Sequence, residues 1–364
     1  MNLATVDQIA KAVLYEGYML YPYRPSSVKN QQRWNFGVLC PRSYSEAQNG
    51  SDAWMMQTEC LIAGRSLTGL EVRVRFLQLV ARSVGELITP VTDVPAGETP
   101  EFRPVENLTV NGRVYQPFQE AAEREVVVPA LRLDDIVLTP LLQPFMFPAA
   151  SEFEYLRETG GPIAAVVIRE QSALQGSIRI DSRRVADGIF RVSVRIRNRT
   201  PFAATQLSTR ENALLSSFVS THTILGVQEG DFISLLAPPE DLGGLAASCI
   251  NIGAWPVLIG QERQCDTMLS SPIILYDYPQ IAPESAGDLF DGTEIDEILS
   301  LRIMTLTDDE KREMSNSDDR ARQILERTET MPAEQFMKLH GVLRGLRPVN
   351  SSSPVSSSLN EETQ

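Results

Sequence analysis

The chain has 364 residues, 43% of them hydrophobic, and a formal net charge of −14. Its length and apolar content allow roughly two or three domains with buried cores, and they exclude an intrinsically disordered protein. The negative charge argues against a nucleic acid backbone or an anionic membrane surface as the main partner, since both bind a concentrated basic face.

The first residues show no pattern of a targeting signal. The first residues, MNLATVDQIAKAVLYEGY, lack the basic start and uninterrupted apolar run of a secretory signal. No window approaches the roughly 18–20 apolar residues of a membrane-spanning helix. We therefore expect a cytoplasmic protein with no membrane insertion.

The chain contains four cysteines, and no two of them form a CxxC pair. Widely spaced cysteines are typical of buried or free thiols in a reducing compartment. A zinc site that uses all four is an open alternative, and so are disulfides, but no close-spaced pair supports the zinc site. The residues are Cys40, Cys60, Cys249 and Cys265.

A short helix is predicted from about Asp7 to Glu16, and a segment rich in aromatic and basic residues follows it. Alone, such a segment resembles a surface on which nucleic acid bases stack. The overall acidity and Pro22 and Pro25 favour a loop packed over a sheet edge, which we take as the first candidate binding surface. Its residues are Tyr18, Tyr21, Tyr23, Arg24, Arg33, Trp34 and Phe36, and Trp255 is added from the later β region.

The first β region extends to about residue 148. Apolar and basic residues alternate between Val72 and Phe76, which predicts a half-buried strand within 54–82. Residues 89–104 carry four prolines and are predicted to be loop, and Asn111-Gly112 indicates a hairpin. Residues 125–142 are predicted to form one or two strands, and the prolines at 140, 144 and 148 suggest a domain boundary.

The second β region holds the clearest hairpin in the sequence. Apolar residues recur with period two over 178–196, and Asp187-Gly188 supplies turn residues between the two runs. The arginines between them predict a basic outer face. That face is either an ordinary polar sheet surface or a site for an anionic partner, such as the acidic tail of this chain. It comprises Arg179, Arg183, Arg184, Arg191, Arg195, Arg197 and Arg199.

After this hairpin, a short helix is predicted over 209–219. Strands are predicted on both sides of a turn at Glu229-Gly230-Asp231, then at 249–259 and 271–278. These spacings are typical of an antiparallel sandwich or a barrel-like body. The fold class is therefore mostly β with a C-terminal α-helical extension, and α+β overall.

The C-terminal extension is acidic and helical. Residues 287–330 contain 13 acidic and 6 basic residues, a net charge of −7. Thr307 and Glu310 fit a capping box, and Pro332 fits the first position of a later helix. The predicted domains are 1–148, 149–286, the helical tail at 287–348, and a low-complexity disordered end at 349–364.

Familiar catalytic and nucleotide-binding motifs are missing from the sequence. It has no GxSxG, HExxH, GxxxxGK[ST] or GxGxxG motif. The two histidines, His222 and His340, are predicted to be structural, the second suited to a helix C-terminus. Acids at 288, 291, 294, 296 and 297 do not follow the calcium-loop spacing, and the helix dipole accounts for them. We predict no catalytic residues, no metal site and no cofactor.

Two segments of the sequence resemble a known protein family. The segment EGYMLYPYRPSSVKNQQRWNFGVLCP near the start and the segment LSSPIILYDYPQIAPESAGDLFDGTEIDEILSLRIMTLTDDEKREM near the end resemble a bacterial family found in the gene neighbourhoods of uptake nickel-iron hydrogenases. The resemblance implies an accessory role in assembling or operating a hydrogenase. The sequence lacks the clustered cysteines of a hydrogenase catalytic subunit or an iron-sulfur carrier.

Three functions stay open at this point. The first is a non-enzymatic accessory, assembly or interaction protein, with hydrogenase subunits or maturation factors as partners and with homo-oligomers allowed. The second is an enzyme with a carboxylate-based site in the β body. The third is a small-ligand binding module lined by Trp34, Trp54 or Trp255.

Overall fold

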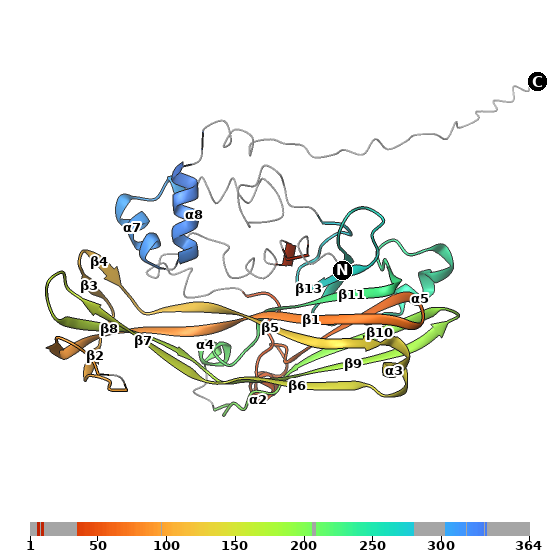
Figure 1. Ribbon diagram of the computed structural model, residues 1–364, viewed down its shortest axis with the longest axis horizontal. Helices are drawn as coiled ribbons and strands as arrows, with labels where there is room; N and C mark the ends of the chain where they lie inside the picture. Colours follow the sequence, from red (N-terminus) through yellow and green to blue (C-terminus); the bar gives the residue numbers. More distant parts are fainter. Residues whose placement is uncertain are drawn as a thin grey trace, which may run out of the picture.

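The computed structural model describes residues 6–7, 9–10, 35–95, 97–205, 209–279, 303–317, 319–330 and 332. In this part the chain is mostly antiparallel β structure, as predicted (Figure 1). The elements, in order, are α2 (Arg42–Ala47), β1 (Met55–Val91), β2 (Phe102–Pro104), β3 (Leu108–Val110), β4 (Arg113–Tyr115), β5 (Phe118–Arg132), α3 (Leu133–Leu138), β6 (Leu141–Phe147), β7 (Ala150–Arg157), β8 (Ile163–Gln171), β9 (Leu174–Ala186), β10 (Ile189–Asn198), α4 (Arg210–Leu214), β11 (Val219–Ile233), η2 (Glu240–Leu242), α5 (Gly243–Ala247), β12 (Trp255–Leu258), β13 (Thr267–Ser271), α7 (Asp308–Ser317) and α8 (Asp319–Thr330).

Strand β1 organises the sheet, because it is 37 residues long and changes neighbours along its length. It pairs first with β10 and β11, then with β11 and β5, and finally with β8 and β2. A long strand that changes partners in this way makes the sheet coil, because each paired strand is rotated relative to β1 by the twist between neighbouring strands. The result is a curled 11-stranded antiparallel sheet.

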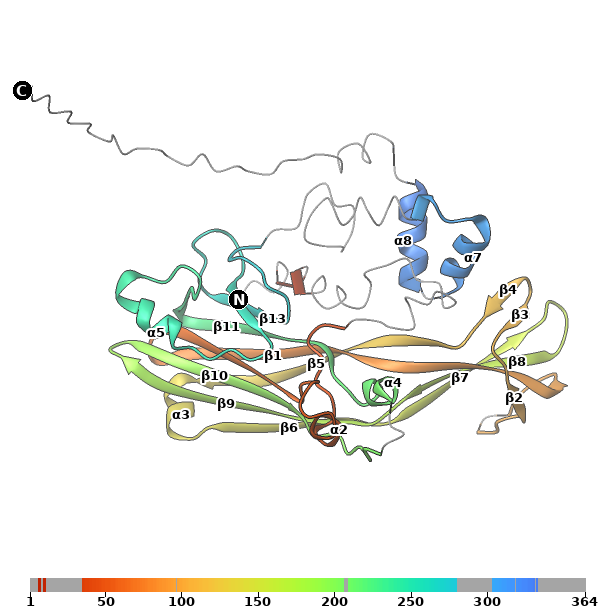
Figure 2. The same cartoon turned by 180° about the vertical axis from the view of Figure 1, so that it is seen from behind.

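The curl places two layers of strands face to face. Figures 1 and 2 show β5, β1 and β11 running along one layer, with β6, β9 and β10 beneath them at the end where α3 joins β5 to β6. The main core lies between the layers and contains Phe76, Phe190 and Phe218, all fully buried. In β1 the predicted alternation holds, because Val72, Val74 and Phe76 are buried in this core.

Both predicted hairpins are confirmed. Strands β9 and β10 pair on either side of Asp187-Gly188, and Gly188 has a φ of 67°. Strands β3 and β4 pair around Asn111-Gly112, whose φ values are 51° and 77°. Positive φ at both central residues, as at Asn111-Gly112, is the geometry of a type I′ turn, which matches the twist of the flanking strands.

Several predicted element limits are wrong. Glu229-Gly230-Asp231 is not a turn: β11 runs through it, and the irregularity is a bulge in which residues 65–68 of β1 lie opposite Glu229. Residues 271–278 are not a strand, because β13 occupies 267–271. Residues 89–104 are not all loop, because β1 extends to Val91 and β2 lies at 102–104. Helix α3 interrupts the strands predicted over 125–142.

One sheet contains strands from both sides of the predicted boundary at 148. Strand β1 pairs with β8, β10 and β11, and β6 pairs with β9. Hydrogen bonding is therefore continuous across residue 148, although the turn between β6 and β7 does fall there.

The described helices at the two ends of the chain pack on the sheet. Val6, Ile9 and Ala10 lie against Ile224 and Val257. From the acidic tail, Ile303, Met314 and Leu325 share a buried cluster with Leu77 and Leu79 of β1.

The predicted capping box of the tail is also confirmed. Thr307 N donates to Glu310 Oε2 at 2.7 Å, and Glu310 N donates to Thr307 Oγ1 at 3.3 Å. Reciprocal bonds of this kind satisfy two backbone donors at the start of α7. The helices predicted around 293–306 and after Pro332, and the end at 349–364, lie largely outside the described residues.

Candidate interaction surface

The predicted aromatic surface is represented by two residues in the described part of the structure. Tyr18, Tyr21, Tyr23, Arg24, Arg33 and Trp34 lie outside the described residues. Phe36 is half-buried, and its carbonyl oxygen accepts from Ser220 N at 3.0 Å. Trp255 is 44% exposed on β12 and pairs in register with Ser271. Phe36 therefore lies beside the start of β11, whereas Trp255 lies on the edge strand β12.

The basic face predicted for the β9–β10 hairpin is present, with one correction. Arg184 lies on the core side, because it is in register with Phe190 and its guanidinium lies 5.2 Å from the centre of that ring. Alternation along β9 explains this, since residue 184 shares a face with the inward Ile178 and Ile180. The other arginines fall into two groups on the outer face.

The first group lies near the hairpin turn. Arg191 and Arg183 are cross-strand neighbours, and Arg191 donates to the carbonyl oxygen of Leu245 at 3.3 Å and to Ser248 Oγ. Arg191 therefore holds the loop around α5 against the sheet. This is a structural role that leaves little of its donor capacity for a partner.

The second group lies at the other end of the hairpin, and register builds a grid there. Strand β10 and the residue after it contribute Arg195, Arg197 and Arg199. Opposite them lie, respectively, Arg179, Ser177 and Gln175 of β9. Beyond β9, the edge strand β6 contributes Leu142, Pro144 and Met146 in the same order. We call these nine residues the arginine face.

The cations of the arginine face have few acidic partners. Arg179 lies 3.5 Å from Asp181, and Arg195 Nε donates to the amide oxygen of Gln57 at 2.8 Å. Among the described residues, Arg195, Arg197 and Arg199 form no ion pair, and Arg197 Nε is buried without a hydrogen-bond partner. Like-charged guanidinium groups that lie close together repel one another, so a carboxylate-bearing partner would relieve this repulsion.

The electrostatic cost of the arrangement is seen at Arg197. Burial lowers the pKa of its guanidinium, and the neighbouring positive charges of Arg195, Arg199, Arg179 and Arg42 lower the same pKa further. Trp54 lies between two of these groups. The centre of its ring is 4.9 Å from the Arg42 guanidinium carbon and 5.8 Å from that of Arg197.

Apolar side chains extend the arginine face across the edge strand. Leu142 is 54% exposed and Met146 is 64% exposed, whereas Phe145 and Phe147 of the same strand point into the core. Pro144 has no N–H to donate, and a proline on an edge strand opposes pairing with another strand. The exposed apolar groups therefore favour contact with side chains over extension of the sheet.

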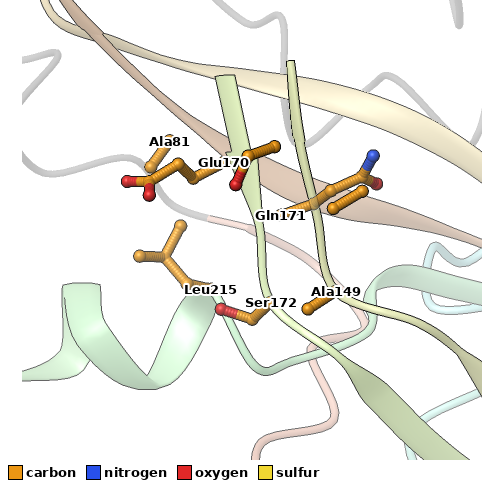
Figure 3. A pocket seen from close by; sticks show the side chains of 8 residues that line it. Ala81, Ala149, Glu170, Gln171, Ser172 and Leu215 are labelled. Atoms are coloured by element: carbon orange, nitrogen blue, oxygen red, sulfur yellow. The ribbon is translucent and has the colours of Figure 1, made fainter. Parts of the chain in front are cut away.

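A separate pocket of about 470 Å³ lies between β8 and the end of α4, and Figure 3 shows its lining. The Glu170 backbone pairs with β1 and β7, whereas its carboxylate forms no hydrogen bond or ion pair with any described residue. The Gln171 side-chain oxygen accepts from Arg124, and the Ser172 backbone carbonyl accepts from Gln78, which leaves the Ser172 hydroxyl facing the pocket. The lining residues are Ala81, Ala149, Ala150, Ser151, Glu170, Gln171, Ser172 and Leu215.

Trp54 and Trp255 do not line this pocket, and Trp34 lies outside the described residues. The pocket contributes one carboxylate, whereas acid–base chemistry with paired carboxylates requires two. Its chemistry fits a small cationic or hydroxylated ligand held by Glu170 and the two serine hydroxyls.

His222 is fully buried in β11, where it is in register with Arg75 of β1. Its Nδ1 donates to the backbone oxygen of Ser220 at 3.0 Å, and Nε2 has no hydrogen-bond partner in the described part of the chain. Burial lowers the pKa of His222 to about 4, and the Arg75 charge adds to this effect. His222 thus contacts a backbone carbonyl and not a nucleophilic side chain.

The four cysteines are free thiols. Burial raises the pKa of Cys40 to about 11 and raises that of Cys60 further. In the described ranges, no three His, Cys, Asp or Glu side chains converge as metal ligands. Of the helices the structure describes, none has the length and apolar character needed to cross a bilayer.

Comparison with known families and with curated proteins finds no match to this sequence. The class of protein is therefore defined by its fold and surface, as a curled antiparallel β protein with an outer arginine face.

Proposed function

We propose that this protein is a non-enzymatic accessory or assembly protein that binds another protein through the arginine face. One observation carries this proposal: unpaired guanidinium groups lie beside exposed apolar side chains on one surface of a chain with net charge −14. Arginine and methionine are enriched in protein–protein interfaces, and exposed apolar groups rimmed by charge are typical of binding sites.

The resemblance of residues 15–41 and 269–314 to a hydrogenase-associated family suggests the partner. Subunits or maturation factors of an uptake nickel-iron hydrogenase are the first to test. The purified chain is mixed with each purified candidate, and binding is measured by biolayer interferometry.

The double substitution Arg195→Ala/Arg197→Ala should weaken binding by about 10-fold or more, because each arginine supplies charge-assisted hydrogen bonds. The matched control is Arg103→Ala/Arg113→Ala, which removes the same charge from exposed positions on β2 and β4. Equal loss of binding in both variants would show that net charge, and not this surface, determines the interaction. Binding to none of the candidates would remove the hydrogenase link.

A second candidate function, a small-ligand binding module, is favoured by the unpaired carboxylate of Glu170 in the 470 Å³ pocket. Small primary amines should then raise the melting temperature of the protein, because a ligand bound only to the folded state stabilises it. Glu170→Gln should abolish the shift, whereas Glu101→Gln, at an exposed position outside the pocket, should leave it intact. An amine-dependent shift that survives Glu170→Gln would argue against the pocket as its source.

A further inference from the structure

The dimensions of the arginine face indicate what shape of partner it fits. Residues two apart in a strand lie about 6.6–6.8 Å apart, so Arg195 to Arg199 extends about 13 Å along β10. Neighbouring strands lie about 4.8 Å apart, so the apolar row of β6 runs parallel to the arginine row at about 10 Å. The face therefore presents two parallel stripes, one cationic and one apolar, separated by the row on β9.

Two stripes about 10 Å apart match the width of an α-helix, which is about 10–12 Å across with its side chains. A helix along β9 reaches Arg195, Arg197 and Arg199 on one side and Leu142 and Met146 on the other. Beneath its axis lie Ser177 and Gln175, which are uncharged, and Arg179, which adds a cation opposite Arg195. An extended peptide covers only one of the two stripes, and Pro144 opposes its pairing with the β6 edge.

The charge pattern distinguishes among possible macromolecules. A nucleic acid backbone would gain from the arginines, but the apolar stripe and the overall charge of −14 both disfavour it. A row of carboxylates suits guanidinium groups, because each guanidinium can donate two parallel hydrogen bonds to one carboxylate. The chain's own described acidic helices are not the occupant. Figures 1 and 2 place α7 and α8 on the opposite side of the upper layer, where they pack on Leu77 and Leu79.

We infer that the arginine face is a docking site for an acidic amphipathic helix of a partner protein. Its carboxylates lie on Arg195, Arg197 and Arg199, and its apolar residues lie on Leu142 and Met146. This inference rests on the proposed function and gives the partner a chemical class. The helix lies across the outer surface of the sheet and leaves the β6 edge unpaired.

The inference is tested with the full chain and a fluorescein-labelled peptide of about 15 residues, which spans about 22 Å as a helix. The peptide carries a glutamate stripe beside a leucine stripe, and a scrambled peptide of the same composition is its control. Fluorescence anisotropy should show that the patterned peptide binds about 10-fold tighter than the scrambled one, and binding should weaken as salt rises. Peptide circular dichroism should show added helix on binding.

Substitutions then separate the two stripes. Two double variants should each weaken binding of the patterned peptide by about 10-fold, the value expected when contacts in an interface are lost. These variants are Arg195→Ala/Arg197→Ala and Leu142→Ser/Met146→Ser. Arg103→Ala/Arg113→Ala should not weaken this binding. Circular dichroism of each variant checks folding. If the first variant does not fold, Arg195→Gln/Arg197→Gln replaces it, because glutamine keeps a hydrogen-bonding side chain without the charge.

Several outcomes would overturn the inference. These are equal binding of both peptides, no binding of either, or tighter arginine-dependent binding of a single-stranded DNA oligonucleotide or of anionic vesicles. A dimer in solution that Arg195→Ala/Arg197→Ala dissociates would assign the face to a second copy of the chain. If hydrogenase proteins bind through the arginines while the patterned peptide does not, the proposed function stands and only the helical partner is rejected.

Discussion

Replacing Phe76 with alanine is expected to lower the free energy of unfolding by about 3–5 kcal/mol. Phe76 is 0% exposed at the centre of the core between the two layers. Its ring centre lies 4.6 Å from that of Phe218, 5.8 Å from Phe147 and 6.1 Å from Phe145. Truncation removes three ring contacts and leaves a cavity that rigid strands cannot fill.

Urea unfolding at pH 7.5, followed by circular dichroism, measures this loss. Val127→Ala is the matched control, because Val127 lies on neighbouring β5 and is 50% exposed, so its truncation should cost under about 0.5 kcal/mol. If Phe76→Ala does not fold, Phe76→Leu provides a milder step. A loss below about 1 kcal/mol for Phe76→Ala would mean that the two layers are not packed through these rings.

Acid should destabilise the protein through His222. The folded-state pKa of His222 is about 4, below its ordinary value of 6.5, because the imidazole is buried and beside Arg75. Between these two values the unfolded chain binds a proton that the folded chain does not. Stability present above pH 6.5 is therefore lost as pH falls, by about 1.4 kcal/mol per unit and about 3 kcal/mol by pH 4.

The atoms of His222 explain the direction of this shift. Nδ1 already donates to the Ser220 carbonyl, so a second proton must enter at Nε2, for which the described residues provide no acceptor. Charging the ring there leaves a buried, unsatisfied donor near the Arg75 guanidinium.

Urea unfolding of wild type and His222→Gln at pH 7.5, 5.5 and 4.5 isolates this contribution. The difference between the two proteins should change by about 3 kcal/mol over this range, in favour of the variant at low pH. His340→Gln is the control, because it removes the other histidine and leaves His222 in place. Parallel pH dependence in wild type and His222→Gln would contradict a neutral, buried His222.

Local chemistry explains which elements were predictable from sequence. Asp187-Gly188 and Asn111-Gly112 form the expected hairpins because Gly188, Asn111 and Gly112 adopt the positive φ that few residue types tolerate. Thr307 and Glu310 form the expected capping box because both bonds lie within one turn of helix. These features depend on residues that are close together in the chain.

The wrong predictions share a different cause. Glu229 has a φ of 58°, which resembles a turn, but four residues of β1 on the partner strand accommodate it as a bulge. The reach of β1 to Val91 is likewise decided by β8, which pairs with its end. Strands distant in sequence determine both features. The β propensity of one segment carries no information about which distant strand will pair with it.

The arginine face was likewise predictable in part from local sequence and in part only from strand pairing. Period-two patterning predicted a basic outer face on β9 and β10, although Arg184 lies on the core side. The neighbours of that face, Trp54 and Leu142, were not assigned to it. Their places depend on the pairing of β1 with β10 and of β6 with β9.

By itself the sequence determined the β-rich class of this protein, its two tight hairpins, the cap of its acidic helix and the alternation that turns arginines outward. Each of these is set by backbone sterics or by hydrogen bonds over a few residues. Only the tertiary structure decided that β1 joins five strands in one curled sheet and that arginines meet Leu142 and Met146 on one surface. Strand register is the physical reason, because it is chosen when distant segments bury their apolar faces together.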